Sequence, residues 1–442
     1  MNESDICWNP ILETMPREKL HDIQLHKFKE IFKWAYDNSR FYRKVYNDAG
    51  IQPGDIKTFG DISKVPKVEK SMLRAAQGQG KEPFPYGDML SVPIDRVTTY
   101  RQTSGTTGQP VYQADTWQDW DFWAEAWAYI LYAQGYRSTD RVFLPFGYNV
   151  FVAFWAAHYG AEKLGCEVVP GGVLNTEARV LKIQELKPVA FMATPTYVLG
   201  MADQARKMGI DPATLGIQRI TVAGEPGGSV PGTRKRMENA WGAKVYDHVG
   251  ATEIGAWGYE CTFQSGIHAN EGLFLVEIED LVTGRLIDSP GKPGKMIITN
   301  LNREAQPCIR FDSKDVIMWN EESCECGRTY RLLKGGVIGR ADDITKVKGV
   351  LLAPTAIEEV VRSIPELLDE YEVIVTKKGD IDDISLKCEI NPGSDQKSVM
   401  SRLVDQLRIK TNLAYNIEFC APGTLTKYEL KAKRFKDLRK EH

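Results

Sequence analysis

The chain has 442 residues, more than one ordinary hydrophobic core requires, so we expect two or three domains. Its formal net charge of -3 excludes the strong basic field that binding to nucleic acid or to an anionic membrane would need. No apolar run approaches the roughly 20 residues of a membrane helix, and the first residues lack the layout of a secretion signal. We therefore predict a cytoplasmic protein that binds neither nucleic acid nor membrane, whose 8 cysteines are reduced or bound to metal.

The first half of the chain predicts helices and strands in alternation. Residues 10–50 have helical apolar spacing, and a helix over 116–132 is crowded with aromatic residues. Its tryptophans fall near one face, which is typical of a core stripe, although that face could also border a substrate and the helix could serve a homodimer contact. Short apolar runs predict strands at 141–145, 167–170, 189–193, 219–223 and 244–246, with helices at 152–164 and 197–208. We expect a mostly parallel sheet covered on both faces, with ligands at the carboxyl ends of its strands.

The second half of the chain has a different pattern. Short strands with polar turns predict a β-rich subdomain over about 260–338. The last hundred residues have β-α-β character, with a helix near 396–413, and are long enough for a separate domain. The prediction is an α/β protein with a large N-terminal domain of mostly parallel sheets over 1–339 and a small α+β domain over 340–442.

One loop holds only hydroxyl residues and glycines, and its members are Thr103, Ser104, Gly105, Thr106, Thr107 and Gly108. Backbone N–H groups and hydroxyls in such a loop can surround phosphate oxygens, although the Walker spacing is absent. Composition alone favours an ordinary loop, so the motifs around it decide the interpretation.

Further motifs follow in an order that resembles the adenylate-forming enzymes, the superfamily of acyl-coenzyme A synthetases, adenylation domains and luciferases. The resemblance covers about residues 100–435 and rests on the phosphate loop and on strings at 223–226, 247–253, 309–315, 339–343 and 425–434. The short chain, the Cys-x-Cys-Gly-Arg string at 324–328 and the Gly-Val string at 349 resemble the phenylacetate–coenzyme A ligase branch.

The resemblance implies a two-step ligase of aromatic acid catabolism. ATP would convert a small aromatic acid, such as phenylacetate, indoleacetate or a benzoate, into acyl-AMP and pyrophosphate, and coenzyme A would then displace AMP. Thr252, Glu253 and Lys431 would be catalytic, with Glu253 binding Mg²⁺ and Lys431 supplying the cation for adenylation. The small domain would be mobile and turn about a hinge at Asp342 between the two half-reactions.

The same resemblance implies the binding residues. The nucleotide would contact the phosphate loop together with Gly224, Glu225, Pro226, Asp247, Asp315 and Arg340, of which Asp315 would accept from the ribose hydroxyls. The acid would lie in a pocket lined by Phe146, Tyr148, Phe151, Ala223, Gly250 and Ala251.

Two positions depart from the family pattern. Gln109 stands where relatives usually have lysine, and Val249 stands where an aromatic ring normally stacks on adenine. Two alternatives therefore stay open: an adenylyltransferase of the same fold, of the type that adenylates a deazaflavin cofactor, and a non-catalytic nucleotide-binding sensor. The sequence names neither the acid nor the oligomeric state, and no residue identifies coenzyme A directly.

A separate set of residues suggests a second metal. Cys261 and His268 form a Cys-x6-His pair, and Cys324 and Cys326 form a Cys-x-Cys pair. Three thiolates and an imidazole suit tetrahedral Zn²⁺ in a closed structural site. The alternative is a set of reduced, unconnected cysteines, since Cys-x-Cys is tighter than the usual zinc spacing.

Overall fold

The computed structural model describes residues 6–103, 109–348, 350–378, 381–426 and 434–440. The chain divides into two compact units. Met1–Gly224 and Met237–Val337 form the larger unit, and Glu225–Arg236 and Ile338–His442 form the smaller one. None of the helices in the described part of the chain combines the length and the apolar character needed to cross a membrane.

The larger unit is built around a sheet with the strand order β14-β10-β9-β8-β7-β6-β4-β5. Pairing is parallel from β5 to β8 and antiparallel from β8 to β14, which confirms the predicted mostly parallel α/β core. The strands are β4 Arg141–Leu144, β5 Glu167–Pro170, β6 Ala190–Ala193, β7 Arg219–Val222, β8 Lys244–Ala251, β9 Gly255–Tyr259, β10 Ile267–Ala269 and β14 Leu332–Leu333.

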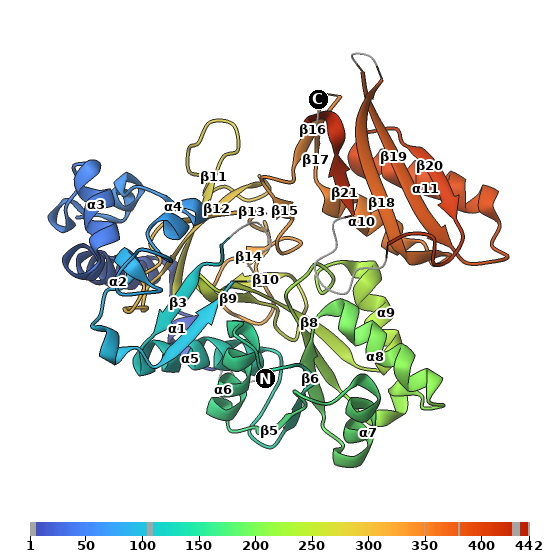
Figure 1. Ribbon diagram of the computed structural model, residues 1–442, viewed down its shortest axis with the longest axis horizontal. Helices are drawn as coiled ribbons and strands as arrows, with labels where there is room; N and C mark the ends of the chain where they lie inside the picture. Colours follow the sequence, from blue (N-terminus) through green and yellow to red (C-terminus); the bar gives the residue numbers. More distant parts are fainter. Residues whose placement is uncertain (1–5, 104–108, 349, 379–380, 427–433, 441–442) are drawn as a thin grey trace. The chain divides into compact units, whose positions relative to one another are not determined.

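Helices cover both faces of this sheet (Figure 1). One hydrophobic core contains residues of α5 Trp117–Ala133 and α6 Val152–Leu164. A second core contains residues of α7 Thr176–Leu186, α8 Pro195–Lys207 and α9 Pro231–Trp241. The aromatic stripe of α5 is a core stripe, as predicted, because Trp120, Trp123 and Trp127 are at most 3% exposed. These three rings therefore do not supply the homodimer contact that was considered for this helix.

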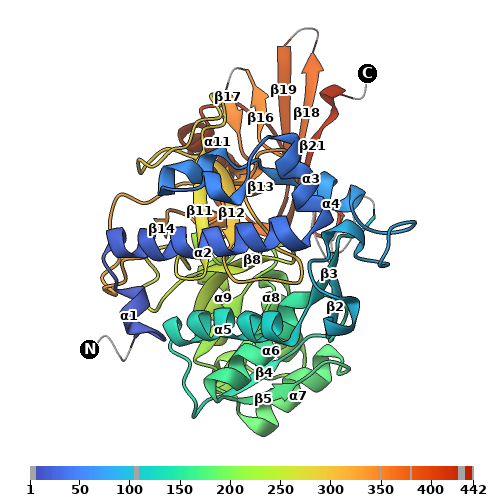
Figure 2. The ribbon, with the colours of Figure 1, turned by 90° about the vertical axis from the view of Figure 1, so that its left-hand side faces the viewer.

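A second sheet in the same unit has the order β1-β13-β12-β11. Its strands are β1 Val68–Glu69, β11 Phe274–Glu279, β12 Gly294–Asn300 and β13 Phe311–Ile317, and the N-terminal helices are α1 Pro10–Glu13, α2 Arg17–Asn38, α3 Arg40–Asp48 and α4 Lys70–Ala75. Helix α2 runs across this sheet (Figure 2), and Gln24 on it donates to the carbonyls of Glu271 and Phe274. The strands expected over 260–338 are thus shared between two sheets.

A two-stranded hairpin of β2 Thr99–Gln102 and β3 Tyr112–Asp115 carries the predicted phosphate loop between its strands. Thr103 closes the neck of the loop, because its N–H donates to the Val111 carbonyl and its hydroxyl accepts from the Val111 N–H, both at 3.0 Å. Ser104, Gly105, Thr106, Thr107 and Gly108 lie outside the described residues.

The smaller unit has its own core and its own sheet, with the order β20-β19-β18-β21. Its elements are β15 Gly339–Arg340, β16 Thr345–Val347, β17 Val350–Leu352, α10 Pro354–Ser363, β18 Leu367–Lys378, β19 Ile381–Ile390, α11 Gln396–Thr411, β20 Asn416–Cys420 and β21 Phe435–Asp437. The segment Glu225–Arg236 joins this unit through Gly232, where an added Cβ would lie 2.5 Å from the Arg362 carbonyl, and through an ion pair of Arg236 with Asp369.

Candidate active site

The catalytic residues predicted at 252 and 253 lie at the tip of the β8–β9 hairpin. The two strands pair from His248 with Tyr259 to Ala251 with Gly255, which leaves Thr252, Glu253 and Ile254 as the turn. Gly250 is required here, because an added Cβ would meet the Gly255 carbonyl oxygen at 2.8 Å. The turn is therefore tight and its position is set by the strands.

A buried arginine binds the backbone of this tip. Arg303 Nη1 donates to the carbonyls of Thr252 and Glu253, at 3.2 and 3.3 Å. Its Nε and Nη2 donate to Asp115 Oδ1 at 2.9 and 2.7 Å, and neither side chain is exposed to solvent. The guanidinium also lies over the Trp123 ring, 5.3 Å from its centroid. Arg303 thus fixes the backbone that carries both predicted catalytic groups.

The Glu253 carboxylate is 6% exposed, and its one ion-pair partner among the described residues is Lys70, whose Nζ lies 2.7 Å from Oε1. An ionised carboxylate oxygen has more than one acceptor site, so Oε1 keeps acceptor capacity beside the Lys70 ammonium. A buried carboxylate oxygen with spare capacity suits a hard cation such as Mg²⁺. Glu253 also lines a small cavity together with Gln77, Gln113, Gln306 and several apolar residues.

The motif residues on either side of this tip have separate surroundings. Asp247 is buried at the end of the parallel part of the sheet, and its Oδ1 accepts from the His248 N–H at 2.9 Å. Burial lowers the pKa of His248 to about 4, so its ring is neutral near pH 7. Ala223 follows β7, and Gly224, at φ +91°, ends the first segment of the larger unit. Glu225 and Pro226 belong to the smaller unit.

The candidate ribose acceptor Asp315 lies on β13, partly exposed, where its N–H donates to Ser313 Oγ at 3.1 Å. Its neighbour Asp312 is the more buried of the two and pairs with Lys295 at 2.7 Å and with Lys314 at 3.1 Å. Burial raises the pKa of Asp312, but the two ammonium groups outweigh burial and the pKa is lowered. Asp312 is therefore committed to internal pairs.

The predicted acid-binding residues follow β4 and form an aromatic cluster with α6. Phe146 is 8% exposed and stacks on Phe154 with ring centroids 3.7 Å apart. The Tyr148 hydroxyl lies 2.6 Å from His158 Nδ1, and Tyr148 also contacts Trp155 edge to face. Phe151 is 37% exposed.

Two further contacts define the surroundings of this cluster. His158 Nε2 is 3.0 Å from Glu162, so the carboxylate fixes the ring that holds Tyr148. The Val150 carbonyl accepts from the Gln102 N–H at 3.1 Å, which ties this loop to the strand that enters the phosphate loop. The acid cluster and the phosphate-loop hairpin therefore adjoin each other within the larger unit.

Of the remaining predicted residues, two lie in the smaller unit, one lies outside the described residues, and four lie in the larger unit. Arg340 and Asp342 form an exposed pair at 3.1 Å near the start of the Ile338–His442 segment. Lys431 lies outside the described residues. Cys261, His268, Cys324 and Cys326 come together, and all four ligand atoms lie within 4.8 Å of one another.

Two functional candidates, Arg303 and Lys70, were missed by the sequence analysis. Each meets its partner far along the chain: Arg303 is 188 residues from Asp115, and Lys70 pairs with Glu253. Neither sits in a motif with characteristic spacing. The signal for Arg303 is an arginine three residues after the buried strand β12, where a charge needs a partner.

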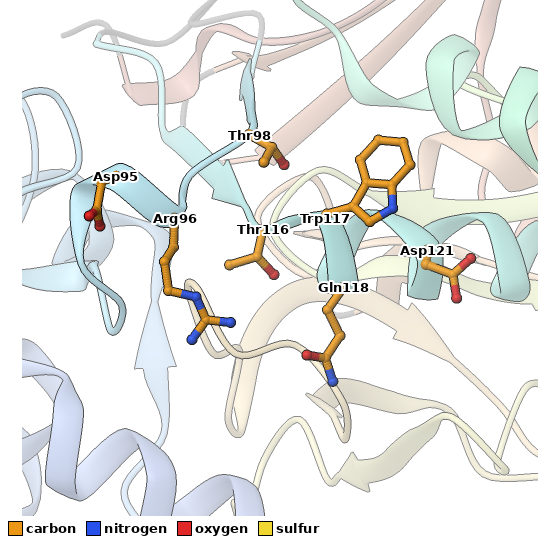
Figure 3. A pocket seen from close by; sticks show the side chains of 7 residues that line it. All are labelled: Asp95, Arg96, Thr98, Thr116, Trp117, Gln118 and Asp121. Carbon is orange, nitrogen blue, oxygen red and sulfur yellow. The ribbon is translucent and has the colours of Figure 1, made fainter.

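An open depression elsewhere in the larger unit contains none of the predicted site residues (Figure 3). It lies at the amino end of α5 and is lined by Asp95, Arg96, Thr98, Thr116, Trp117, Gln118 and Asp121. Its mixed charges match no motif, so we assign the chemistry to the β8–β9 tip.

Comparisons with known proteins found relatives that match most of the chain. Residues 349–439 match the family model described as AMP-binding enzyme C-terminal domain. The phenylacetate-coenzyme A ligase of Aromatoleum evansii is 33% identical over 97% of this chain and 96% of its own length. That of Thermus thermophilus is 33% identical over 87% of this chain and 85% of its own. A crystal structure of 2-hydroxyisobutyryl-CoA ligase with R3-HIB-AMP superposes with a TM-score of 0.90 at 27% identity, covering 99% of this chain and 94% of that one.

Proposed function

Because the chain belongs to the phenylacetate-coenzyme A ligase family, we propose that it joins a small carboxylic acid to coenzyme A at the expense of ATP, through an acyl-adenylate. The observation that carries the proposal is the β8–β9 tip, where Arg303 fixes Thr252 and a buried Glu253 beside the phosphate-loop hairpin. Cytosolic ATP and coenzyme A, together with eight free cysteines, favour a cytoplasmic setting.

The first half-reaction needs groups that stabilise charge on the α-phosphate. The carboxylate oxygen of the acid attacks the α-phosphorus, and the bond to the β-phosphate oxygen breaks, giving acyl-AMP and pyrophosphate. We assign a hydrogen bond to the α-phosphate to the Thr252 hydroxyl, and the metal ligand to Glu253. Bound Mg²⁺ would supply charge neutralisation on the phosphates. Lys431 would supply a second cation, which rests on the resemblance of the 425–434 string.

The nucleotide would be held at its two ends. We assign the phosphates to the loop 103–108, whose neck the Thr103–Val111 bonds close, and the ribose hydroxyls to Asp315. Asp315 lies on the same strand as Asp312 and is partly exposed, and its assignment to the ribose rests on the resemblance of the 309–315 string. Gly224, Glu225, Pro226, Asp247 and Arg340 stay candidate nucleotide contacts, and Asp342 the candidate hinge of a mobile smaller unit.

For the acid, we propose an aromatic ring bound at the Phe146–Tyr148–Phe151 loop. Aromatic side chains that pack edge to face and in stacks suit a planar ligand. Ala223, Gly250 and Ala251 are the small residues assigned to the same pocket. Phenylacetate is the first candidate, because the curated relatives are phenylacetate-coenzyme A ligases. The second proposed ion is a structural Zn²⁺ at the cluster of cysteines and histidine.

A pyrophosphate-release assay with a panel of acids tests the function. Phenylacetate, indoleacetate, benzoate and aminobenzoate are supplied with ATP and Mg²⁺, with and without coenzyme A. We expect release with at least one acid and a thioester when coenzyme A is present. Acyl-AMP that accumulates without thioester would favour an adenylyltransferase, and ATP binding without release for any acid would favour a nucleotide sensor.

A lysine variant tests whether Lys431 supplies the cation for adenylation. Lys431→Ala should slow adenylation by about 100-fold or more, since it removes a charge from the transition state. The matched control is Lys397→Ala, an exposed lysine at the start of α11, which should retain full activity. Equal rates for the two variants would remove Lys431 from the proposed site.

A further inference from the structure

The cluster of three cysteines and one histidine has the dimensions of a metal centre. Cys261 Sγ and Cys324 Sγ are 3.6 Å apart, and Cys326 Sγ is 3.5 Å from His268 Nε2. A disulfide needs about 2.05 Å between sulfurs, so these thiols are not bonded. Ligand atoms about 2.0–2.3 Å from one Zn²⁺ in a tetrahedron lie about 3.5–3.8 Å from each other, which matches both distances.

The surroundings indicate a closed structural site. His268 and Cys261 are at most 1% exposed, and Cys324 and Cys326 are at most 7% exposed, so no position is open for a substrate. His268 Nδ1 lies 3.4 Å from the Tyr330 carbonyl, which orients Nε2 toward the thiols. His268 lies on β10 and Cys261 lies two residues after the end of β9, so one pair of ligands comes from two neighbouring strands.

The other two ligands, Cys324 and Cys326, lie on a loop that continues into Arg328 and Thr329, which contact the N-terminal segment. After Cys326, the chain turns at Gly327, whose φ of +80° favours glycine, and reaches Arg328. Arg328 Nε donates to Glu13 Oε2 at 2.5 Å, and the guanidinium also donates to the Ile6 carbonyl. The Arg328 and Glu13 side chains are 1% and 0% exposed.

The next residue adds backbone contacts to the same segment. The Thr329 N–H donates to the Glu13 carbonyl at 2.9 Å, and its hydroxyl donates to the Met15 carbonyl at 2.6 Å. On the sheet side, the Tyr259 hydroxyl donates to Glu13 Oε2 at 3.3 Å. Residues 6–15 are thus bound by side chains from β9 and from the loop that bears the Cys-x-Cys pair.

We infer that Cys261, His268, Cys324 and Cys326 bind one Zn²⁺, and that this ion fastens the N-terminal segment 6–15 to the β9–β10 sheet edge. The ion fixes Cys324 and Cys326 against strands β9 and β10. Because Arg328 follows two residues later, this fixes the guanidinium that pairs with Glu13. Loss of the ion frees the loop, and the buried ion pair then loses its geometry. The zinc assignment is independent of the ligase proposal.

Metal content tests the first part. Protein produced in zinc-replete medium should contain about one zinc per chain, and Co²⁺ in its place should give the absorption of tetrahedral cobalt with thiolate ligands. Cys324→Ser with Cys326→Ser should abolish binding, whereas Cys166→Ser, a buried cysteine outside the cluster, should keep it. If the double variant fails to fold, native protein can be titrated with a mercurial compound that reacts with thiols. A chromogenic chelator in the same solution should then detect zinc that is released as the thiols react. Less than about 0.1 zinc per chain without a cobalt spectrum, or iron in place of zinc, would overturn the assignment.

Hydrogen exchange tests the second part. After zinc removal, amides in peptides covering 6–15 should exchange about tenfold faster, while peptides of α11 in the smaller unit should keep their rates. Glu13→Ala should speed exchange at 6–15 with zinc still bound, which separates the anchor from the ion. Unchanged exchange at 6–15 after zinc loss would refute the fastening role, as would an equal increase in every peptide.

Discussion

Replacement of Arg303 by methionine should destabilise the larger unit strongly, because it leaves the buried Asp115 carboxylate without its ion-pair partner. Arg303 and Asp115 are both fully buried and share two hydrogen bonds, at 2.9 and 2.7 Å. Removing one partner of a buried ion pair typically costs about 3–5 kcal/mol. The lost bonds to the carbonyls of Thr252 and Glu253 add about 1 kcal/mol, so we expect a loss of about 4–6 kcal/mol near pH 7. Adenylation should fall with it, since the tip loses its support.

The loss should depend on pH with a definite sign. Burial raises the pKa of Asp115 above its ordinary value, although Arg303 opposes this shift. A carboxyl whose folded pKa is raised holds its proton longer in the native state, so stability falls as pH rises through the folded pKa. Without Arg303 that pKa rises further. The cost of Arg303→Met should therefore be smaller at about pH 5 than at about pH 7.5.

Tryptophan fluorescence provides a selective assay in urea. All 10 tryptophans belong to the larger unit, namely Trp8, Trp34, Trp117, Trp120, Trp123, Trp127, Trp155, Trp241, Trp257 and Trp319. The unfolding midpoint and slope of that unit can thus be followed without a signal from the smaller one. Arg206→Met is the matched control, because Arg206 is 52% exposed and its pair with Asp203 lies at the surface.

The double variant decides between a lost ion pair and lost packing. Asp115→Asn with Arg303→Met removes the stranded charge, so it should be more stable than Arg303→Met alone by about 2 kcal/mol or more. A single-variant loss below about 1 kcal/mol, or no recovery in the double variant, would refute the reasoning.

Three further predictions concern ligands. Lys70→Met removes the cation that competes for Glu253, so the Mg²⁺ concentration for half-maximal pyrophosphate release should fall roughly three- to tenfold; an unchanged or higher requirement would count against Glu253 as the metal ligand. Asp315→Asn should raise the KM for ATP about tenfold and leave that for the acid unchanged, and a kcat effect without a KM effect would contradict the ribose assignment. Burial raises the pKa of Tyr148 to about 12, so its hydroxyl stays protonated. Tyr148→Phe should therefore change the KM for the acid without shifting the pH–rate profile, and a shifted profile would assign this hydroxyl a proton-transfer role.

The parallel core was predictable because its signal is local. Each predicted strand from 141 to 223 lies within one residue of an observed one, since short apolar runs between helical stretches have few alternatives. The extent of β8 was missed: it was expected at 244–246 but continues to Ala251. The continuation contains His248 and Gly250, and it is stabilised by pairing with β9. Tertiary pairing therefore overrode local propensity at the strand that carries the site.

The motif residues could be predicted from the sequence, whereas the residues that hold them in place could not. Cysteine and histidine are rare enough that spacing alone singled out four residues that the fold brings together. Spacing does not single out Arg303 and Lys70, because arginine and lysine are common and the partners of these two residues lie on other elements. The segment Glu225–Arg236 was likewise expected in the larger domain, since its contacts with the smaller unit depend on residues more than 100 positions away.

Asp115 links the two segments that the proposed reaction would use together. It ends β3, the strand that leaves the phosphate loop, and its Oδ2 lies 3.5 Å from the Thr99 hydroxyl on β2. Its Oδ1 accepts from Arg303, which holds the Thr252–Glu253 tip. One buried carboxylate thus fixes the β2–β3 hairpin and the β8–β9 hairpin relative to each other. Effects of Asp115 and Arg303 substitutions on adenylation should for this reason be strongly non-additive, because each breaks the same link.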